Sequence, residues 1–108
     1  MSKVIKTDLF QKWFDDLKNK MLRTIIKDKT DRIAVDGYLG KTKPIVGAKG
    51  ISEIKIEMGA GYRIYFNVYI ENDEVWLLSG GDKSTQSKDI EAAKELLQTI
   101  QEGRGAKR

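Results

Sequence analysis

The sequence contains no cysteine and no histidine, and its only proline is Pro44. Without cysteine the chain can form neither a disulfide framework nor a thiolate metal site, and without histidine it lacks the commonest general base and the commonest zinc ligand. These absences exclude zinc hydrolases and thiol enzymes. No apolar run approaches the roughly 18 residues of a membrane span, and the first six residues lack the apolar region of a signal peptide. We therefore expect a cytoplasmic protein with no membrane contact.

The residues that are present indicate one folded domain. The chain has 108 residues, of which 40% are hydrophobic and 33% charged, and a domain commonly takes about 100 to 200 residues. The net charge of +4 is unevenly spread: residues 1–50 carry 12 Lys and Arg against 6 Asp and Glu, whereas residues 51–108 carry 8 against 10. Such an excess permits nucleic-acid binding without requiring it, and any charge that faces a partner is expected to be local.

The N-terminal half has the pattern of a strand followed by two helices. A short apolar strand at residues 4–5 precedes Thr7 or Asp8, either of which can cap a helix. Apolar residues then recur at three- and four-residue spacing over residues 9–33, with a break expected at residues 18–20. The spacing predicts a helical hairpin.

The hairpin is expected to end at Asp36-Gly37, where glycine suits a left-handed cap. Residues 37–50 contain four glycines, the proline and three lysines, which is turn chemistry without periodicity. We expect one long loop here.

The C-terminal half changes to a period of two. Alternation over residues 51–58 and 62–70, and an apolar run at 75–78, predict three antiparallel strands joined by tight turns at Gly59-Ala60-Gly61 and Asn72-Asp73. The expected fold class is α+β, with a mostly antiparallel four-stranded sheet.

A final helix is predicted from about residue 88 to residue 100, and a flexible basic tail over residues 103–108. Residues 1–102 then form a single domain. One face of this helix would carry Ile90, Ala93, Leu97 and Ile100.

Tight turns would place Glu57 opposite Arg63 and Lys55 opposite Tyr65, on one face of the sheet. The other face is aliphatic and needs the helical hairpin as its cover, while the Trp76 end of the first face can take the C-terminal helix. Lys83 follows the third of these strands and can fold back toward the same patch. Lys55, Arg63, Tyr65 and Lys83 would then stay uncovered together.

Ordinary structural roles compete with this interpretation. Cations on a sheet face are commonly solvating residues, and Glu57 with Arg63 is an ordinary cross-strand pair. Trp13 and Phe14 lie in a helical stripe and are assigned to the core. Residues 80–85 follow a strand and precede a helix, but they lack the first glycine of a phosphate-binding loop and have Asp82 before the lysine.

Residues 50–56 (GISEIKI), 61–66 (GYRIYF) and 77–86 (LLSGGDKSTQ), with Asp89, Ile90 and Ala93, resemble the motifs of the RelE/ParE superfamily of toxins. The nearest branch is that of the addiction-module killer proteins, which are similar to HigB. The resemblance extends to Phe10, Trp13, Leu17 and the turn at 37–40, and so covers nearly the whole chain.

This resemblance implies a β-α-α-β-β-β-α fold and a toxin that pairs with a cognate antitoxin protein. For RelE-like members it also implies metal-independent cleavage of mRNA on the ribosome, by attack of a ribose 2′-hydroxyl on the adjacent phosphate, and it implies no cofactor. The basic residues of RelE correspond to Lys55, Arg63 and Lys83. This chain departs from RelE at Glu53, where RelE has a further lysine, and it lacks the histidine of some HigB-like toxins.

Cleavage of RNA by its own 2′-hydroxyl needs a base, cations at the phosphate and a donor for the leaving oxygen. Arg63 is the candidate phosphate clamp and Lys83 a second clamp or the acid. Lys55, with a pKa lowered by neighbouring cations, or Glu57 would be the base, and Tyr65 would stack on a base or position a phosphate.

The candidate RNA-binding residues, including loop lysines that would hold ribosomal RNA phosphates, are Lys41, Lys43, Lys49, Tyr62 and Gln86. Two other functions stay open: a ParE-like toxin that poisons DNA gyrase without cutting RNA, and an inactive nucleic-acid-binding relative.

Overall fold

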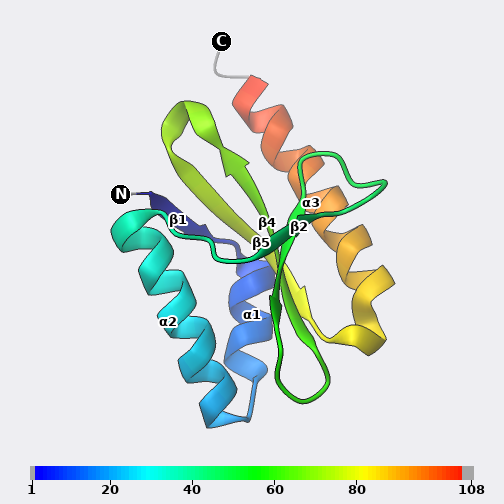
Figure 1. The fold of residues 1–108 in the computed structure, drawn as a ribbon. Coiled ribbons are helices and arrows are strands. Elements are labelled where there is room, and N and C mark those ends of the chain that lie inside the picture. Colours follow the sequence, from blue (N-terminus) through cyan, green and yellow to red (C-terminus); the bar gives the residue numbers. More distant parts are fainter. Residues whose placement is uncertain (1, 106–108) are drawn as a thin grey trace.

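The computed structural model describes residues 2–105 and shows a five-stranded sheet with helices on both sides (Figure 1). Its elements are β1 (Lys3–Lys6), α1 (Asp8–Asp16), α2 (Lys20–Asp36), β2 (Thr42–Pro44), β3 (Ser52–Ile56), β4 (Tyr62–Tyr69), the 3-10 turn η1 (Ile70–Asn72), β5 (Glu74–Gly81), the 3-10 turn η2 (Lys83–Thr85) and α3 (Gln86–Gly105). The expected α+β class and element order are confirmed, apart from one additional strand.

The N-terminal elements begin and end where the sequence predicts. The Thr7 side chain accepts a hydrogen bond from the backbone N–H of Phe10, and the Asn19 side chain accepts one from that of Leu22, so each helix begins at a side-chain cap. Helix α2 ends at Gly37, whose φ of 76° is left-handed.

The additional strand is β2, in the segment expected to be one long loop. Thr42–Pro44 pairs antiparallel with β3 at the edge of the sheet, and the sheet order is β1-β5-β4-β3-β2. A proline is tolerated there because an edge strand leaves one row of N–H groups unpaired. The expectation of four strands was therefore one strand too few.

Both hairpin connections are longer than predicted. Strand β3 pairs with β4 so that Lys55 lies opposite Arg63 and Glu53 opposite Tyr65, two residues away from the expected register. The expected pairs of Glu57 with Arg63 and of Lys55 with Tyr65 are wrong, because the connection takes five residues and places both Gly59 and Gly61 at positive φ. A shift of two residues leaves every side chain on its predicted face.

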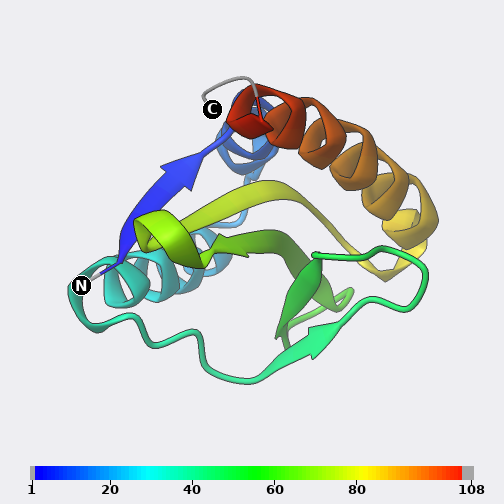
Figure 2. The same cartoon turned by 90° about the horizontal axis from the view of Figure 1, so that it is seen from above.

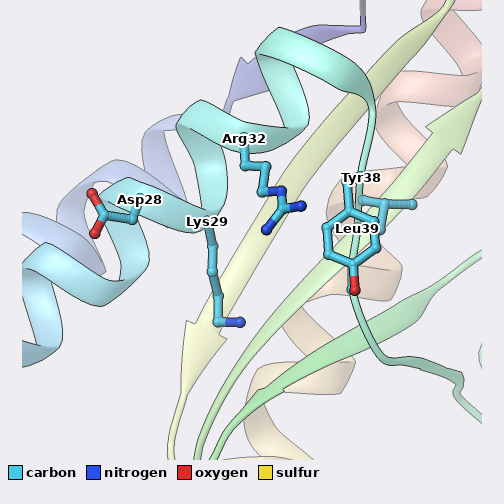
Figure 3. A pocket seen from close by; sticks show the side chains of 6 residues that line it. Asp28, Lys29, Arg32, Tyr38 and Leu39 are labelled. Carbon is cyan, nitrogen blue, oxygen red and sulfur yellow. The ribbon is translucent and has the colours of Figure 1, made fainter.

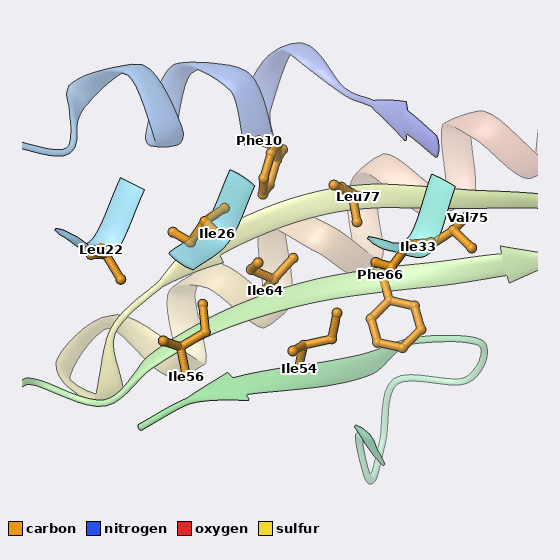
Figure 4. Packing of buried hydrophobic residues seen from close by; sticks show 10 residues of the cluster. All are labelled: Phe10, Leu22, Ile26, Ile33, Ile54, Ile56, Ile64, Phe66, Val75 and Leu77. Atoms are coloured by element: carbon orange, nitrogen blue, oxygen red, sulfur yellow. The ribbon is translucent and has the colours of Figure 1, made fainter. Parts of the chain in front are cut away.

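The aliphatic face of the sheet is covered by α1 and α2, as expected (Figure 4). Its central residues are buried, among them Phe10, Ile26, Ile64 and Leu77. Trp13 and Phe14 pack against this cluster, which confirms their assignment to the core.

The opposite face is covered by α3 (Figure 2). Ala93 and Leu97 are buried against Tyr65 and Leu78, with Trp76 packed beside them. Helix α3 continues to Gly105, so residues 103–105 do not belong to the expected flexible tail, and residues 106–108 lie outside the described part of the chain. In residues 2–105, none of the helices has the length and apolarity to span a membrane.

Candidate functional site

Three cationic residues meet at one end of the sheet. Lys55 on β3 pairs with Arg63 on β4, and Arg63 pairs in turn with Gly81 on β5. Lys83 begins η2 two residues later, and its backbone N–H donates to the carbonyl of Ala60 in the β3–β4 turn, at 3.3 Å. The turn and the start of α3 therefore lie together at this end (Figure 1). The backbones of Lys55, Arg63 and Lys83 thus lie at the same end of the sheet; their grouping into a site and their roles stay a prediction.

Arg63 is buried and already paired. It is 8% exposed, its Nε lies 3.6 Å from Oε2 of Glu53, and its Nη1 donates to the carbonyl of Gly61 at 2.7 Å. The expectation that Arg63 stands uncovered is wrong, because Glu53 and the turn occupy much of its guanidinium. Glu57, the expected partner, is exposed beyond the end of β3.

Tyr65 is also covered. It is 0% exposed because α3 crosses this part of the sheet, and its neighbour Ser79 donates to the backbone carbonyl of Asp89 in that helix. Burial, followed by the nearby Glu53 carboxylate, raises the pKa of Tyr65 to about 12. Tyr65 therefore holds its proton at neutral pH, and the expectation that it is open to a base is wrong.

Removing the Tyr65 hydroxyl should stabilise the fold. Its oxygen is buried and has no hydrogen-bond partner among the described residues, which costs about 1–3 kcal/mol. We expect Tyr65→Phe to raise the free energy of unfolding at pH 7 by about 1 kcal/mol in urea titrations. The gain should grow above pH 10, because the unfolded tyrosine loses its proton there while the folded one keeps it. A less stable variant at pH 7 would mean that the hydroxyl is satisfied.

The Gly80-Gly81 pair at the end of β5 serves packing. A Cβ on Gly80 would overlap the ring of Trp13 on one face, and a Cβ on Gly81 would overlap the carboxylate of Asp89 on the other. The absence of a side chain at Gly80 and Gly81 therefore lets α1 and α3 pack close to the sheet. This agrees with the rejection of a phosphate-binding loop here.

Adding a methyl group at Gly80 should therefore destabilise the protein. Overpacking of a core typically costs about 1–3 kcal/mol, and the Trp13 ring has to move off the sheet to admit the new side chain. We expect Gly80→Ala to lower the midpoint of urea unfolding accordingly. Gly103→Ala is the control, because a Cβ at Gly103 meets open space; equal stability of the two variants would contradict this account.

Lys83 is exposed, and the carboxylates of Asp82 and Asp89 bond to other residues of η2. Asp82 accepts hydrogen bonds from the backbone and hydroxyl of Ser84, and the hydroxyl bond is the main reason that its pKa is lowered. Asp89 accepts one from Thr85 at 2.5 Å, yet burial raises its pKa. Asp89 is part of a motif in the sequence, but it was not predicted as a site residue.

The candidate RNA-binding residues fall into separate places. Lys41 and Lys43 line a hollow of about 640 Å³ with Lys55 and Glu57 at the β3 edge of the sheet. Lys49 lies apart from them, beside α3 and β4.

The two remaining candidates begin their elements. Tyr62 is half-buried against the first core cluster, and Gln86 is the half-buried first residue of α3. No single surface therefore collects all five candidates.

Sequence reasoning missed the wall of the hollow at Lys41 and Lys43. Lys29 on α2 and Tyr38 after it line the same space and also a smaller pocket, which Arg32 lines with its guanidinium over the Tyr38 ring (Figure 3). The helical spacing of Lys29 and Arg32 was a usable signal, since both lie on one side of α2 one turn apart.

Solved structures that are similar to this fold include RelE toxins and RelBE toxin–antitoxin complexes. The E. coli RelBE toxin–antitoxin complex contains a chain with a TM-score of 0.62 and 20% identity, covering 76% of this chain and 96% of that one. A mutant of E. coli toxin RelE in the free state has a TM-score of 0.62 and 19% identity, and the match covers 83% of this chain and 95% of that one. A chain of the RelBE2 complex of Mycobacterium tuberculosis has a TM-score of 0.52 and 17% identity, and the match covers 76% of this chain and 98% of that one. The chain therefore has the RelE fold, as its motifs indicated; the HigB-like branch stays a prediction.

No family model matches the sequence. An uncharacterized protein of Haemophilus influenzae is 42% identical to the chain over 100 residues, which are 89% of this chain and 94% of that protein. The chain belongs to the same family as this Haemophilus protein.

Proposed function

We propose that this protein is the toxin of a toxin–antitoxin pair and that it cleaves mRNA on the ribosome. The observation that carries the proposal is the meeting of Lys55, Arg63 and Lys83 at one end of a RelE-type sheet. Three cations at one place suit the crowded phosphate of a nucleic-acid backbone.

The reaction we propose needs no metal ion and no cofactor. The ribose 2′-oxygen attacks the adjacent phosphorus, the bond from phosphorus to the 5′-oxygen breaks, and a 2′,3′-cyclic phosphate and a 5′-hydroxyl result. Lys55 or Glu57 takes the proton of the 2′-hydroxyl, and Lys83 contacts the phosphate and protonates the leaving oxygen. Arg63 pairs with Glu53 inside the protein, so it contributes positive charge near the phosphate and does not bind the phosphate through both guanidinium nitrogens.

A cognate antitoxin is the proposed protein partner. Two of the similar structures are toxin–antitoxin complexes. A basic surface on a toxin favours a partner that lays an acidic or amphipathic segment across it. We expect a gene next to the one for this chain to encode the antitoxin.

The proposal is tested by inducing the protein in growing cells and mapping the 5′ ends of cellular mRNA. We expect growth arrest, new 5′ ends within translated codons, and recovery when the adjacent gene is expressed too. Arrest with intact mRNA and altered plasmid supercoiling would instead assign a gyrase poison.

A second candidate is a nucleic-acid-binding relative that does not cut. The observation that favours it is Glu53, which pairs with Arg63 and offsets one of the three positive charges. Harmless overexpression of a folded protein, without its antitoxin, would support this candidate over the nuclease.

A further inference from the structure

The hollow at the β3 edge combines an apolar floor with a basic rim. Ile25 and Ile56 line it from the helical and the sheet side. Four lysines line it too, Lys29, Lys41, Lys43 and Lys55, together with the carboxylates of Glu53 and Glu57; the lysines are exposed except the half-buried Lys29. An apolar floor beside four cations suits a nucleobase whose flanking phosphates reach the lysines.

Tyr38 forms one wall of this hollow and is exposed to an unusual degree for an aromatic residue, at 56%. The Arg32 guanidinium lies over its ring, 4.4 Å from the centroid (Figure 3). Exposed aromatic rings and arginine planes are the surfaces on which unpaired bases stack.

The carboxylate of Asp36 contacts both Arg32 and the backbone of Tyr38. Asp36 accepts a hydrogen bond from the backbone N–H of Tyr38 at 2.9 Å, and its other oxygen lies 3.8 Å from Nε of Arg32. Gly37, at a φ of 76°, turns the chain between them. Asp36 therefore fixes the backbone at Tyr38 and attracts the exposed Arg32 side chain, which in turn contacts the Tyr38 ring.

We propose that Tyr38 and Arg32 form a stacking platform for a base of single-stranded RNA, with Lys29 and Lys43 on the flanking phosphates. This inference rests on the proposed function in taking the ligand to be RNA. Lys55 belongs both to this hollow and to the cationic end of the sheet. An RNA strand would thus run from the Arg63 end of the sheet over its edge to α2.

The test is binding of a fluorescein-labelled single-stranded RNA of about 12 nucleotides to the full chain, followed by anisotropy. We expect Tyr38→Leu to weaken binding about tenfold, and Tyr38→Phe to keep it. The slope of affinity against salt should stay unchanged in Tyr38→Leu, since no phosphate contact is lost. Lys43→Ala should reduce that slope by about 0.7.

Tyr69→Leu is the matched control, because Arg104 lies over the Tyr69 ring at 4.0 Å in the same way, on β4 away from the hollow. Unchanged affinity in Tyr38→Leu, or equal losses in both tyrosine variants, would overturn the inference. Weaker antitoxin binding with unchanged RNA binding would assign the platform to the antitoxin and overturn it as well. Binding is measured without cleavage, so a failure of the proposed nuclease activity gives a separate result.

Discussion

Lys83→Ala is expected to abolish growth arrest and to reduce mRNA cleavage by about 100-fold or more. Lys83 is an exposed cation that lies beside the β3–β4 turn, just after the end of β5, and we assign it to the phosphate and the leaving oxygen. Removing one preorganised donor to a developing negative charge costs about 10²–10³ in rate. The measurement is the rate of cleavage on programmed ribosomes with equal amounts of folded protein.

The fold should tolerate this change, because the Lys83 side chain is exposed and only its backbone N–H bonds to the β3–β4 turn. Lys12→Ala is the matched control: Lys12 is equally a surface lysine, on α1, and it forms an ion pair with Asp16 in the same helix. Wild-type cleavage by a folded Lys83→Ala variant would contradict the assignment of Lys83.

Arg63→Ala is expected to destabilise the protein by about 3–5 kcal/mol in addition to removing its activity. The side chains of Arg63 and Glu53 are each 9% exposed, and they face each other inside the protein. Removing the arginine leaves the Glu53 charge buried without its partner, which is more costly than losing the pair as a whole. Urea unfolding at pH 7 measures the loss.

The double variant Arg63→Met with Glu53→Leu separates stability from activity. Replacing both members of a buried ion pair by apolar residues of similar volume is often neutral or stabilising. We therefore expect the double variant to regain stability and to stay inactive, because the positive charge is still missing. A stable double variant that cleaves mRNA would show that Arg63 has no part in the chemistry.

The faces of the strands and the order of the elements could be predicted from the sequence. Alternation fixes which side of a strand enters the core, and the register error of two residues preserves that alternation. The N-caps at Thr7 and Asn19 and the glycine at Gly37 are local chemistry, which needs no knowledge of the tertiary structure.

The hairpin registers could not be predicted, because they depend on the length of each connection. A glycine-rich stretch permits both a three-residue and a five-residue turn, and the choice depends on the positive φ values at Gly59 and Gly61. A further irregularity between Tyr65 and Phe66, opposite Leu78, shifts the pairing of β4 with β5 by one residue. Strand β2 was missed because three residues are too few to show a period.

The sequence could predict which elements carry the candidate residues, but not how exposed these residues are. Lys55 lies on β3 and Arg63 opposite it on β4, whereas Lys83 begins η2 after the end of β5. The exposure of Tyr65 depends on the angle at which α3 crosses the sheet, and this angle cannot be read from a sequence pattern.

A reconstituted translation reaction with one defined message tests the central claim most directly. The account predicts that the wild-type protein cuts the message within a codon held by the ribosome, leaving a 2′,3′-cyclic phosphate, and that Lys83→Ala leaves it whole. A message that stays intact on stalled ribosomes in the presence of folded wild-type protein would contradict the account.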